Sequence, residues 1–121
     1  MSAQSQPTIT TTVVPAADIA KHRFVTWAGV QATADEDCMG ISFENLVANR
    51  SGLVVMGVTG IIEAGAVIDG SVIHLKSDAN GRAIPCTVGD TPQAVLKAGQ
   101  TAGAVGDQIE VFPLNPIAPL A

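Results

Sequence analysis

β-Branched residues dominate this chain and constrain its fold more than any other feature of the sequence. Valine and isoleucine together number 24 against six leucines, and ten threonines add to the β-branched total. A branched Cβ restricts χ1 and packs well on a pleated surface, so this composition favours strands over helices. Twelve glycines and seven prolines are spread along the chain and divide it into segments of strand length. We therefore predict a mainly β fold, either a small antiparallel β-barrel or a β-sandwich.

The length of the chain sets its domain organisation. A chain of 121 residues matches one compact domain and leaves no room for a second. We predict an extended N-terminal arm at residues 1–15, a β-domain at residues 16–113 and an extended, Pro-rich C-terminal tail at residues 114–121. The Thr-rich arm favours an extended backbone, with terminal disorder in the isolated protein as the alternative. The prolines of the tail, together with Pro113, favour the same kind of backbone.

Alternating or continuous apolar segments predict the strands of the domain. These segments are residues 21–30, 38–43, 53–58 with a second short apolar pair at 61–62, 71–76 and 108–112. The strand at residues 21–30 carries Trp27, the single tryptophan of the chain. Two interpretations of Trp27 remain open, a partly buried core residue and an anchor at an interface.

Two further segments carry turn or helix signals. Asn80-Gly81 tolerates the positive φ angles of a type I′ turn, so we predict a β-hairpin whose second strand lies within residues 82–88. Residues 91–99 have a threonine cap, a proline at the first helical position and a terminal glycine, as a short helix does. Two helical turns are marginal without packing, so a strand at residues 94–98 is equally compatible with the sequence.

A six-residue motif occurs twice. Residues 64–69 and 102–107 agree at five of six positions, and each copy precedes an alternating segment. Two copies do not make a solenoid, which needs at least three repeats.

The charge balance excludes several classes of partner. Six basic residues against eleven acidic ones give a net charge of −5, which argues against nucleic-acid binding through a cationic face. The longest apolar runs, residues 51–62 and 111–121, are shorter than the ~20 residues of a membrane helix. Residues 1–20 lack an export signal, so we expect synthesis in the cytoplasm and no membrane partner. In that compartment Cys38 and Cys86 are expected as separate thiols.

The residues that carry chemistry show no site pattern. His22, His74, Cys38 and Cys86 lack metal-ligand spacing, and no phosphate-binding loop or nucleophile motif is present. Acidic residues 35–37 disfavour a Cys38 thiolate, so we expect a buried or inert thiol there, and we interpret these acidic residues as a solvated loop. We therefore predict no catalytic residues, no metal, no cofactor and no enzymatic activity.

A succession of glycine-punctuated segments carries a family resemblance. These segments are Cys38-Met39-Gly40-Ile41, the stretch from Ser51 to Gly60, the stretch from Ala64 to Val72, the hairpin Asp78-Ala79-Asn80-Gly81-Arg82-Ala83, and Gly106-Asp107-Gln108-Ile109-Glu110-Val111. Their order resembles the small decoration, or cement, proteins of tailed bacteriophage capsids. The arm and the tail lie outside the resemblance.

The resemblance implies a compact and usually trimeric β-fold in the virion, without catalysis. Such a protein sits on the outer capsid surface and clamps neighbouring copies of the major capsid protein. The resemblance also favours a strand at residues 94–98. The family's contact residues vary, so none is carried over individually.

The expected contact is an addition of the arm to strands of the capsid. It would use Thr8, Ile9, Thr10, Thr11, Thr12, Val13 and Val14. The alternative is a soluble β-barrel that binds a small molecule in a pocket beside His74. A third interpretation, an enzyme with His22 or His74 as general base, has only single histidines to support it.

Overall fold

The computed structural model describes residues 6–114, which form β-strands joined by turns and loops. The strands are β1 (Gln6–Val13), β2 (Phe24–Thr26), β3 (Cys38–Ser42), β4 (Gly52–Glu63), β5 (His74–Ser77), β6 (Ala83–Pro85), β7 (Ala94–Leu96) and β8 (Gln108–Pro113). No described segment is an α-helix, so none has the length and apolarity of a membrane-spanning helix. The predicted mainly β fold is confirmed.

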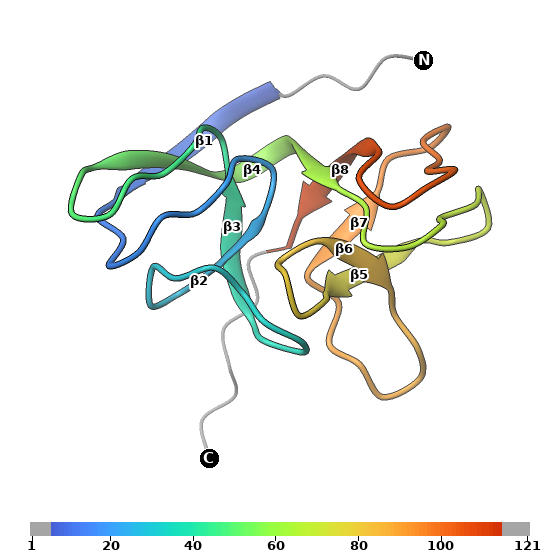
Figure 1. Ribbon diagram of the computed structural model, residues 1–121. Coiled ribbons are helices and arrows are strands. Elements are labelled where there is room, and N and C mark those ends of the chain that lie inside the picture. The colour runs from blue at the N-terminus through green and yellow to red at the C-terminus, as the bar shows by residue number, and fades with distance from the viewer. Residues whose placement is uncertain (1–5, 115–121) are drawn as a thin grey trace.

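Two antiparallel sheets share the long strand β4 (Figure 1). In the first sheet, the N-terminal part of β4 pairs with β1 on one side and β3 on the other, and β2 pairs with β3. In the second sheet, residues 60–63 of β4 pair with β8, and the order continues through β7 and β5 to β6. A parallel bridge from Ala64 to Ala83 brings β6 back toward the end of β4. The barrel is not closed, and a sandwich fits the arrangement.

The main core lies between the two sheets. Its largest members include Phe24 and Ile41 from the first sheet and Ile62, Leu75 and Ile109 from the second, each exposed by 1% or less. Burial of such aliphatic side chains is the main favourable term in folding.

A smaller core covers the other face of the first sheet. Ile19 and Leu46 come from two loops that are joined by hydrogen bonds between these two residues, with N–O distances of 2.9 and 2.7 Å. They pack with Val25, Met39 and Val54. All five residues of β3 are buried, because this strand has a core on each of its faces. This is why four of its five residues are apolar and their sequence does not alternate; the fifth, Ser42, is a buried polar residue.

Two sequence expectations are revised by tertiary packing. β2 ends at Thr26, so Trp27 lies in a turn rather than inside a strand over residues 21–30. Residues 53–58 and 61–62 belong to one continuous strand, β4. Of the two alternatives for residues 91–99, the structure shows the strand that the resemblance favours: residues 94–96 form β7, which pairs with β5 and with β8.

The predicted hairpin is present with a different turn. β5 and β6 pair antiparallel, from Ser77–Ala83 to Leu75–Pro85. The Gly81 amide donates to the Asp78 carbonyl over 3.3 Å, the Asp78 amide donates to the Arg82 carbonyl over 2.8 Å, and Gly81 has a φ of +74°. A type I′ turn requires positive φ at both central residues, and Asn80 does not adopt it. Asn80-Gly81 thus indicated the hairpin correctly but not its turn type.

The two copies of the six-residue motif pair with each other. The amides of Ile68 and Ala102 each donate to the carbonyl of the other, over 2.9 and 2.8 Å. The Ala64 amide donates to the Asp107 carbonyl over 2.8 Å, and the Gly106 amide donates to the Ala64 carbonyl over 2.8 Å. The repeat therefore forms a two-stranded contact at one end of the second sheet.

Candidate functional site

The residues predicted to contact a partner lie on β1 and just after it. β1 pairs antiparallel with β4, from Gln6 opposite Thr59 to Val13 opposite Gly52, with register irregularities around Ile9. Residues 6–13 of the predicted arm thus belong to the first sheet of their own chain, while residues 1–5 lie outside the described part. Within the described residues, β4 is the one strand with which β1 pairs. The other edge of β1 presents main-chain groups to which a further strand can add.

The side chains at the end of β1 alternate between the protein and solvent. Thr11 and Val13 are half-buried, whereas Thr10, Thr12 and Val14 are exposed. Val13 packs against the smaller core. The last part of β1 is therefore fixed both by its pairing with β4 and by this apolar contact.

Trp27 lies on a tight turn after β2. The Gly29 amide donates to the Thr26 carbonyl over 2.9 Å, and the Thr26 amide donates to the Val30 carbonyl over 2.8 Å. Gly29 has a φ of +79°, a conformation that L residues with a side chain rarely adopt. The turn leaves the Trp27 side chain 42% exposed, which is compatible with both interpretations of this residue.

The end of β1 and the Trp27 turn line one hollow of about 270 Å³, which we call the Trp27 groove. The structure thus brings together two features that lie far apart in the sequence and were singled out separately. Met39 of β3, which no sequence pattern marks as a contact residue, also lines the groove. The lining consists of Thr11, Thr12, Val13, Val14, Trp27, Ala28, Gly29 and Met39, and none of these residues is charged. An uncharged groove with an aromatic side chain suits contact with an uncharged partner segment.

The acidic segment at residues 35–37 is structural rather than merely solvated. Asp35 forms an ion pair with Lys76, with an Nζ–Oδ1 distance of 2.8 Å. Glu36 accepts hydrogen bonds from the Thr33 amide and hydroxyl, which lower the pKa of its carboxyl. Asp37 accepts a hydrogen bond from the Gln93 side chain over 3.0 Å. Lys76 and Gln93 hold the loop between β2 and β3 against the second sheet, and the contact of Glu36 with Thr33 lies within the loop.

The histidines and cysteines are not arranged as a reactive centre. Cys38 is buried, and its burial together with Glu36 and Asp37 raises the pKa of the thiol to about 12. Cys38 and Cys86 are free thiols, as predicted. Burial lowers the pKa of His22, whose Nδ1 lies 3.2 Å from the Ile61 carbonyl oxygen. Among the described residues, no group of three or more His, Cys, Asp or Glu side chains is placed to hold a metal ion.

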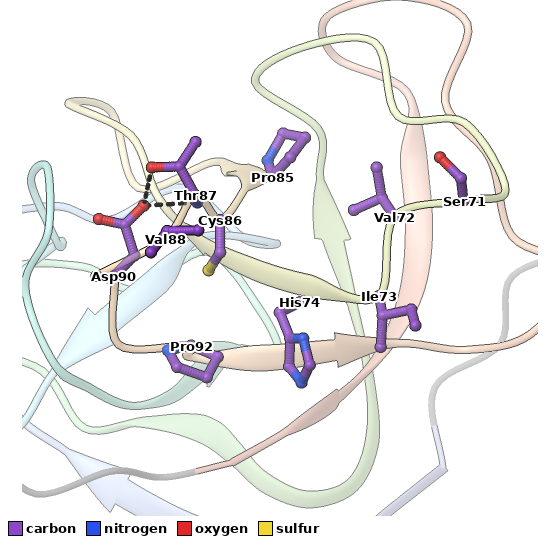
Figure 2. A pocket seen from close by; sticks show the side chains of 11 residues that line it. Ser71, Val72, Ile73, His74, Pro85, Cys86, Thr87, Val88, Asp90 and Pro92 are labelled. Carbon is purple, nitrogen blue, oxygen red and sulfur yellow. Dashed lines mark hydrogen bonds between the residues drawn. The ribbon is translucent and has the colours of Figure 1, made fainter.

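A second hollow, of about 590 Å³, lies on the second sheet beside His74 (Figure 2). We call it the His74 hollow. Figure 2 shows His74 on one side and the loop from Pro85 to Pro92 on the other. It is lined by Ser71, Val72, Ile73, His74, Pro85, Cys86, Thr87, Val88, Gly89, Asp90 and Pro92. Ile73 is 59% exposed and Val88 is fully exposed, so the hollow faces solvent.

The loop that borders the His74 hollow is fixed by Asp90. The Thr87 amide and hydroxyl donate to Asp90 Oδ2 over 2.8 and 2.9 Å, and Lys76 Nζ lies 2.9 Å from the same oxygen (Figure 2 draws the Thr87 bonds). The hydrogen bond from the Thr87 backbone, followed by the contact with Lys76, lowers the pKa of Asp90 to about 2. The single carboxylate of this lining is therefore paired with Lys76, which it shares with Asp35, and the remaining surface is largely apolar.

Comparison with known proteins identifies a similar fold. No family model matches the sequence, and no curated protein matches it. One similar solved structure is the crystal structure of the head fiber gp8.5 N base in bacteriophage phi29. The two structures superpose with a TM-score of 0.70 over 88% of this chain and 94% of that chain, at 14% sequence identity. At this identity the comparison shows a common fold.

Proposed function

We propose that this chain is a structural protein of a tailed-phage virion that decorates the outer capsid surface. Its fold is similar to that of the head fiber base of a phage, over 88% of the chain, and this observation supports the proposal most strongly. The resemblance of the glycine-punctuated segments to capsid decoration proteins points to the same class by an independent route. In this role the protein stabilises the shell by clamping adjacent major capsid protein subunits, and it does so as a homotrimer.

The contact surface in this proposal consists of the outer edge of β1 and the Trp27 groove beside it. β1 is already paired with β4, so its backbone is ordered before a partner arrives. A capsid strand that adds to β1 exchanges hydrogen bonds to water for main-chain bonds, and only the partner loses conformational freedom. The aromatic face of Trp27 then covers an uncharged side chain of the partner.

A trimer strengthens such contacts through multivalency. One strand addition with one aromatic anchor gives modest affinity, but three linked contacts exceed a single one by about 10²–10⁴ when they engage together. The shared strand β4 and the core between the sheets hold each subunit as a stiff body. A stiff subunit transmits outward pressure on the shell from one capsid protein to the next.

The proposal is tested by co-sedimentation of the purified chain with shells assembled from the major capsid protein. Thr12→Lys places a charge on the exposed side of β1, and charged side chains on an edge strand oppose strand addition. Trp27→Ala removes the aromatic anchor. We expect each variant to weaken binding about tenfold or more, equivalent to ~1.4 kcal/mol or more.

The matched control is Thr101→Lys, which places the same charge at an exposed threonine outside the Trp27 groove. It is expected to bind like the natural protein. Deletion of residues 1–14 removes β1 altogether and should abolish binding. Unchanged binding of all these variants would reject this contact surface, and no binding of the natural protein to shells would reject the decoration role.

A second candidate function is a small-molecule-binding protein, because His74 lines a hollow of about 590 Å³. Sites for small ligands bury about 70–90% of the ligand surface. The exposed Ile73 and Val88 leave the His74 hollow open to solvent, so it offers a small ligand little enclosure. A stable monomer that binds a small molecule in this hollow would favour the second candidate over the first.

A further inference from the structure

The turn between β5 and β6 carries the one Asn-Gly step of the chain, Asn80-Gly81. In such a step the backbone nitrogen of the glycine can attack the carboxamide carbon of the asparagine, because a glycine has no Cβ to obstruct the approach. Asn80 is exposed, and its carboxamide has no hydrogen-bond partner within residues 6–114. The Gly81 amide makes a long hydrogen bond of 3.3 Å to the Asp78 carbonyl. Both reacting groups are therefore accessible in the folded protein.

The guanidinium of Arg23 contacts the peptide group that joins Asn80 to Gly81. Its Nη1 donates to the Asn80 carbonyl over 3.0 Å, and this carbonyl belongs to the same peptide group as the Gly81 nitrogen. When that nitrogen loses its proton, resonance shares the negative charge with the carbonyl oxygen. A cationic donor at the oxygen stabilises the anion, as the donors of an oxyanion hole do. Arg23 thus favours the form of the Gly81 nitrogen that acts as a nucleophile.

The fold holds Arg23 against this turn from two sides. Arg23 Nη2 lies 3.1 Å from Glu63 Oε1 at the end of β4, and the Arg23 side chain is only 14% exposed. The amide of Phe24, the next residue, donates to the Gly81 carbonyl over 2.7 Å, so the start of β2 lies against the same turn. Arg23 is distant from the turn in the sequence, and only the tertiary structure brings it to the reacting peptide.

We propose that Asn80 is a site of self-modification, which the chain converts to aspartate and isoaspartate. The Gly81 nitrogen gives its proton to solvent and forms a bond to Asn80 Cγ. The Cγ–Nδ2 bond breaks, and Nδ2 leaves as ammonia with a proton from solvent, which produces a succinimide ring. Water, the sole co-reactant, opens the ring at either carbonyl. Opening at Cγ gives aspartate with the natural backbone, and opening at the other carbonyl gives isoaspartate with one more backbone carbon.

The modification also balances the charge of a cationic cluster. Arg23 and Arg82 share one carboxylate, since both donate to Glu63 Oε1, over 3.1 and 3.2 Å. Conversion of Asn80 adds a second carboxylate beside Arg23, so that each guanidinium has a carboxylate available. The turn lies outside the Trp27 groove, and the inference does not depend on the capsid role.

The experiment follows the loss of the Asn80 amide while the folded full chain is incubated at mildly alkaline pH. Trypsin cuts after Lys76 and Arg82, so residues 77–82 form a peptide with a single asparagine. Mass spectrometry measures its conversion, and chromatography separates the aspartate and isoaspartate forms. Arg23→Gln and Arg23→Met each remove the cation, and methionine keeps an unbranched stem. Circular dichroism verifies that each variant is folded.

The matched control is Arg82→Gln, which removes the other partner of Glu63 but no contact with the Asn80 carbonyl. Folded Arg23→Gln and Arg23→Met should lose the Asn80 amide about tenfold more slowly than the natural chain, since they lack one anion-stabilising donor. Arg82→Gln should react at the natural rate. Asn45 and Asn49, which precede leucine and arginine, should keep their amides in the same samples. In urea all these chains should convert Asn80 at one rate, because unfolding removes the Arg23 contact.

An unmodified Asn80 in the folded natural chain would overturn the proposal. So would a natural rate in a folded Arg23 variant, or an equal slowing in Arg82→Gln. If neither Arg23 variant folds, the natural chain alone provides the test. A hairpin turn restrains ring closure, so without activation the folded chain would react more slowly than the same chain in urea. Activation by Arg23 predicts a folded rate at least as high, and a lower one would overturn it.

Discussion

At the scale of single residues, the fold depends on a few polar groups that are buried together with their partners. Glu110 on β8 is fully buried, although the alternation of its strand suggests a solvent-facing position. Its carboxylate lies 3.1 Å from Lys97 Nζ, and its amide donates to the Gln100 side chain over 3.1 Å. A buried carboxylate is tolerated when a cation and hydrogen bonds accompany it, because an isolated charge in the interior is strongly unfavourable.

Gly40 is a residue whose size is set by the close approach of β3 to β4. A Cβ at this position would meet the Val55 carbonyl oxygen and lie 2.9 Å from Val54 Cγ1. We expect Gly40→Ala to lower the free energy of unfolding by about 3 kcal/mol, since neither backbone can move aside within two cores. Urea denaturation measures this loss. Gly70→Ala is the control, because a Cβ there meets nothing within 4 Å, and its effect should be about 0.5 kcal/mol or less. Equal effects of the two variants would contradict the close packing of β3.

Asp90 gives the protein a defined pH dependence. The pKa of the Asp90 carboxyl is about 2 in the folded protein, whereas an aspartate side chain without these interactions has a pKa of 3.8. Because the folded pKa is the lower one, the stabilisation by Asp90 is complete above pH 3.8 and is lost as the pH falls toward 2. We therefore expect Asp90→Asn to lower the thermal midpoint at neutral pH and to differ less from the natural protein as the pH approaches 2. Thermal unfolding followed by circular dichroism measures both. A difference that stays constant over this range would contradict the assigned hydrogen bonds.

At the scale of secondary-structure elements, local sequence predicts some strands well and others poorly. The strand at residues 38–42 and the hairpin of β5 and β6 follow from apolar pattern and from Asn80-Gly81. β7 cannot be predicted from its local sequence alone, because a threonine cap, a proline and a glycine are also compatible with a helix. Pairing with β5 and β8 makes this segment a strand. The continuity of β4 across two sheets is likewise a property of its neighbours rather than of its own residues.

The candidate contact surface could be predicted only in pieces. Trp27 and the Thr-rich segment stand out in the sequence, but their meeting in one groove depends on the order of β1, β4, β3 and β2 in the first sheet. Met39 carries no signal that separates it from an ordinary core residue. The exposure of Val88 follows from a loop that Asp90 fixes through Thr87 and Lys76, and these contacts join distant parts of the chain.

Gln93 links the two sheets just before β7 begins. It is 3% exposed, its side-chain oxygen accepts a hydrogen bond from the Cys38 amide over 2.7 Å, and its side-chain nitrogen donates to Asp37 and to the Thr91 carbonyl. We expect Gln93→Ala to lower the free energy of unfolding by about 2–3 kcal/mol, because it leaves the buried Cys38 amide without an acceptor. Gln108→Ala, at an exposed glutamine on β8, should change it by about 0.5 kcal/mol or less. Chemical denaturation measures the free energy of unfolding of both variants. A similar decrease in the two would disprove the link between the sheets through Gln93.

At the scale of the whole molecule, the sandwich separates two surfaces that differ in their expected occupants. Figure 1 shows β1 at one side of the molecule and β5 with β6 at the other. The Trp27 groove lies beside β1 on the first sheet, and the His74 hollow lies on the second. The two surfaces share no lining residue, so the proposed capsid contact at the first would leave the second accessible.

The proposed trimer is a prediction about the free protein as well as about the particle. Self-association must bury roughly 1,000 Å² or more to be stable, which requires apolar surface that a single chain leaves exposed. On the outer face of the second sheet, Phe112 of β8 is opposite Val95 of β7, and Val95 is opposite His74 of β5. These three side chains form a continuous row across three strands, to which another subunit can bind. We expect sedimentation equilibrium to give three times the 12.3 kDa chain mass, and Phe112→Lys, at a half-exposed position, to shift the mass toward one chain. Val105→Lys, at an exposed valine outside this row, is the matched control and should remain trimeric. A mass of one chain at every concentration would refute the trimer and would leave any capsid contact without the gain from multivalency.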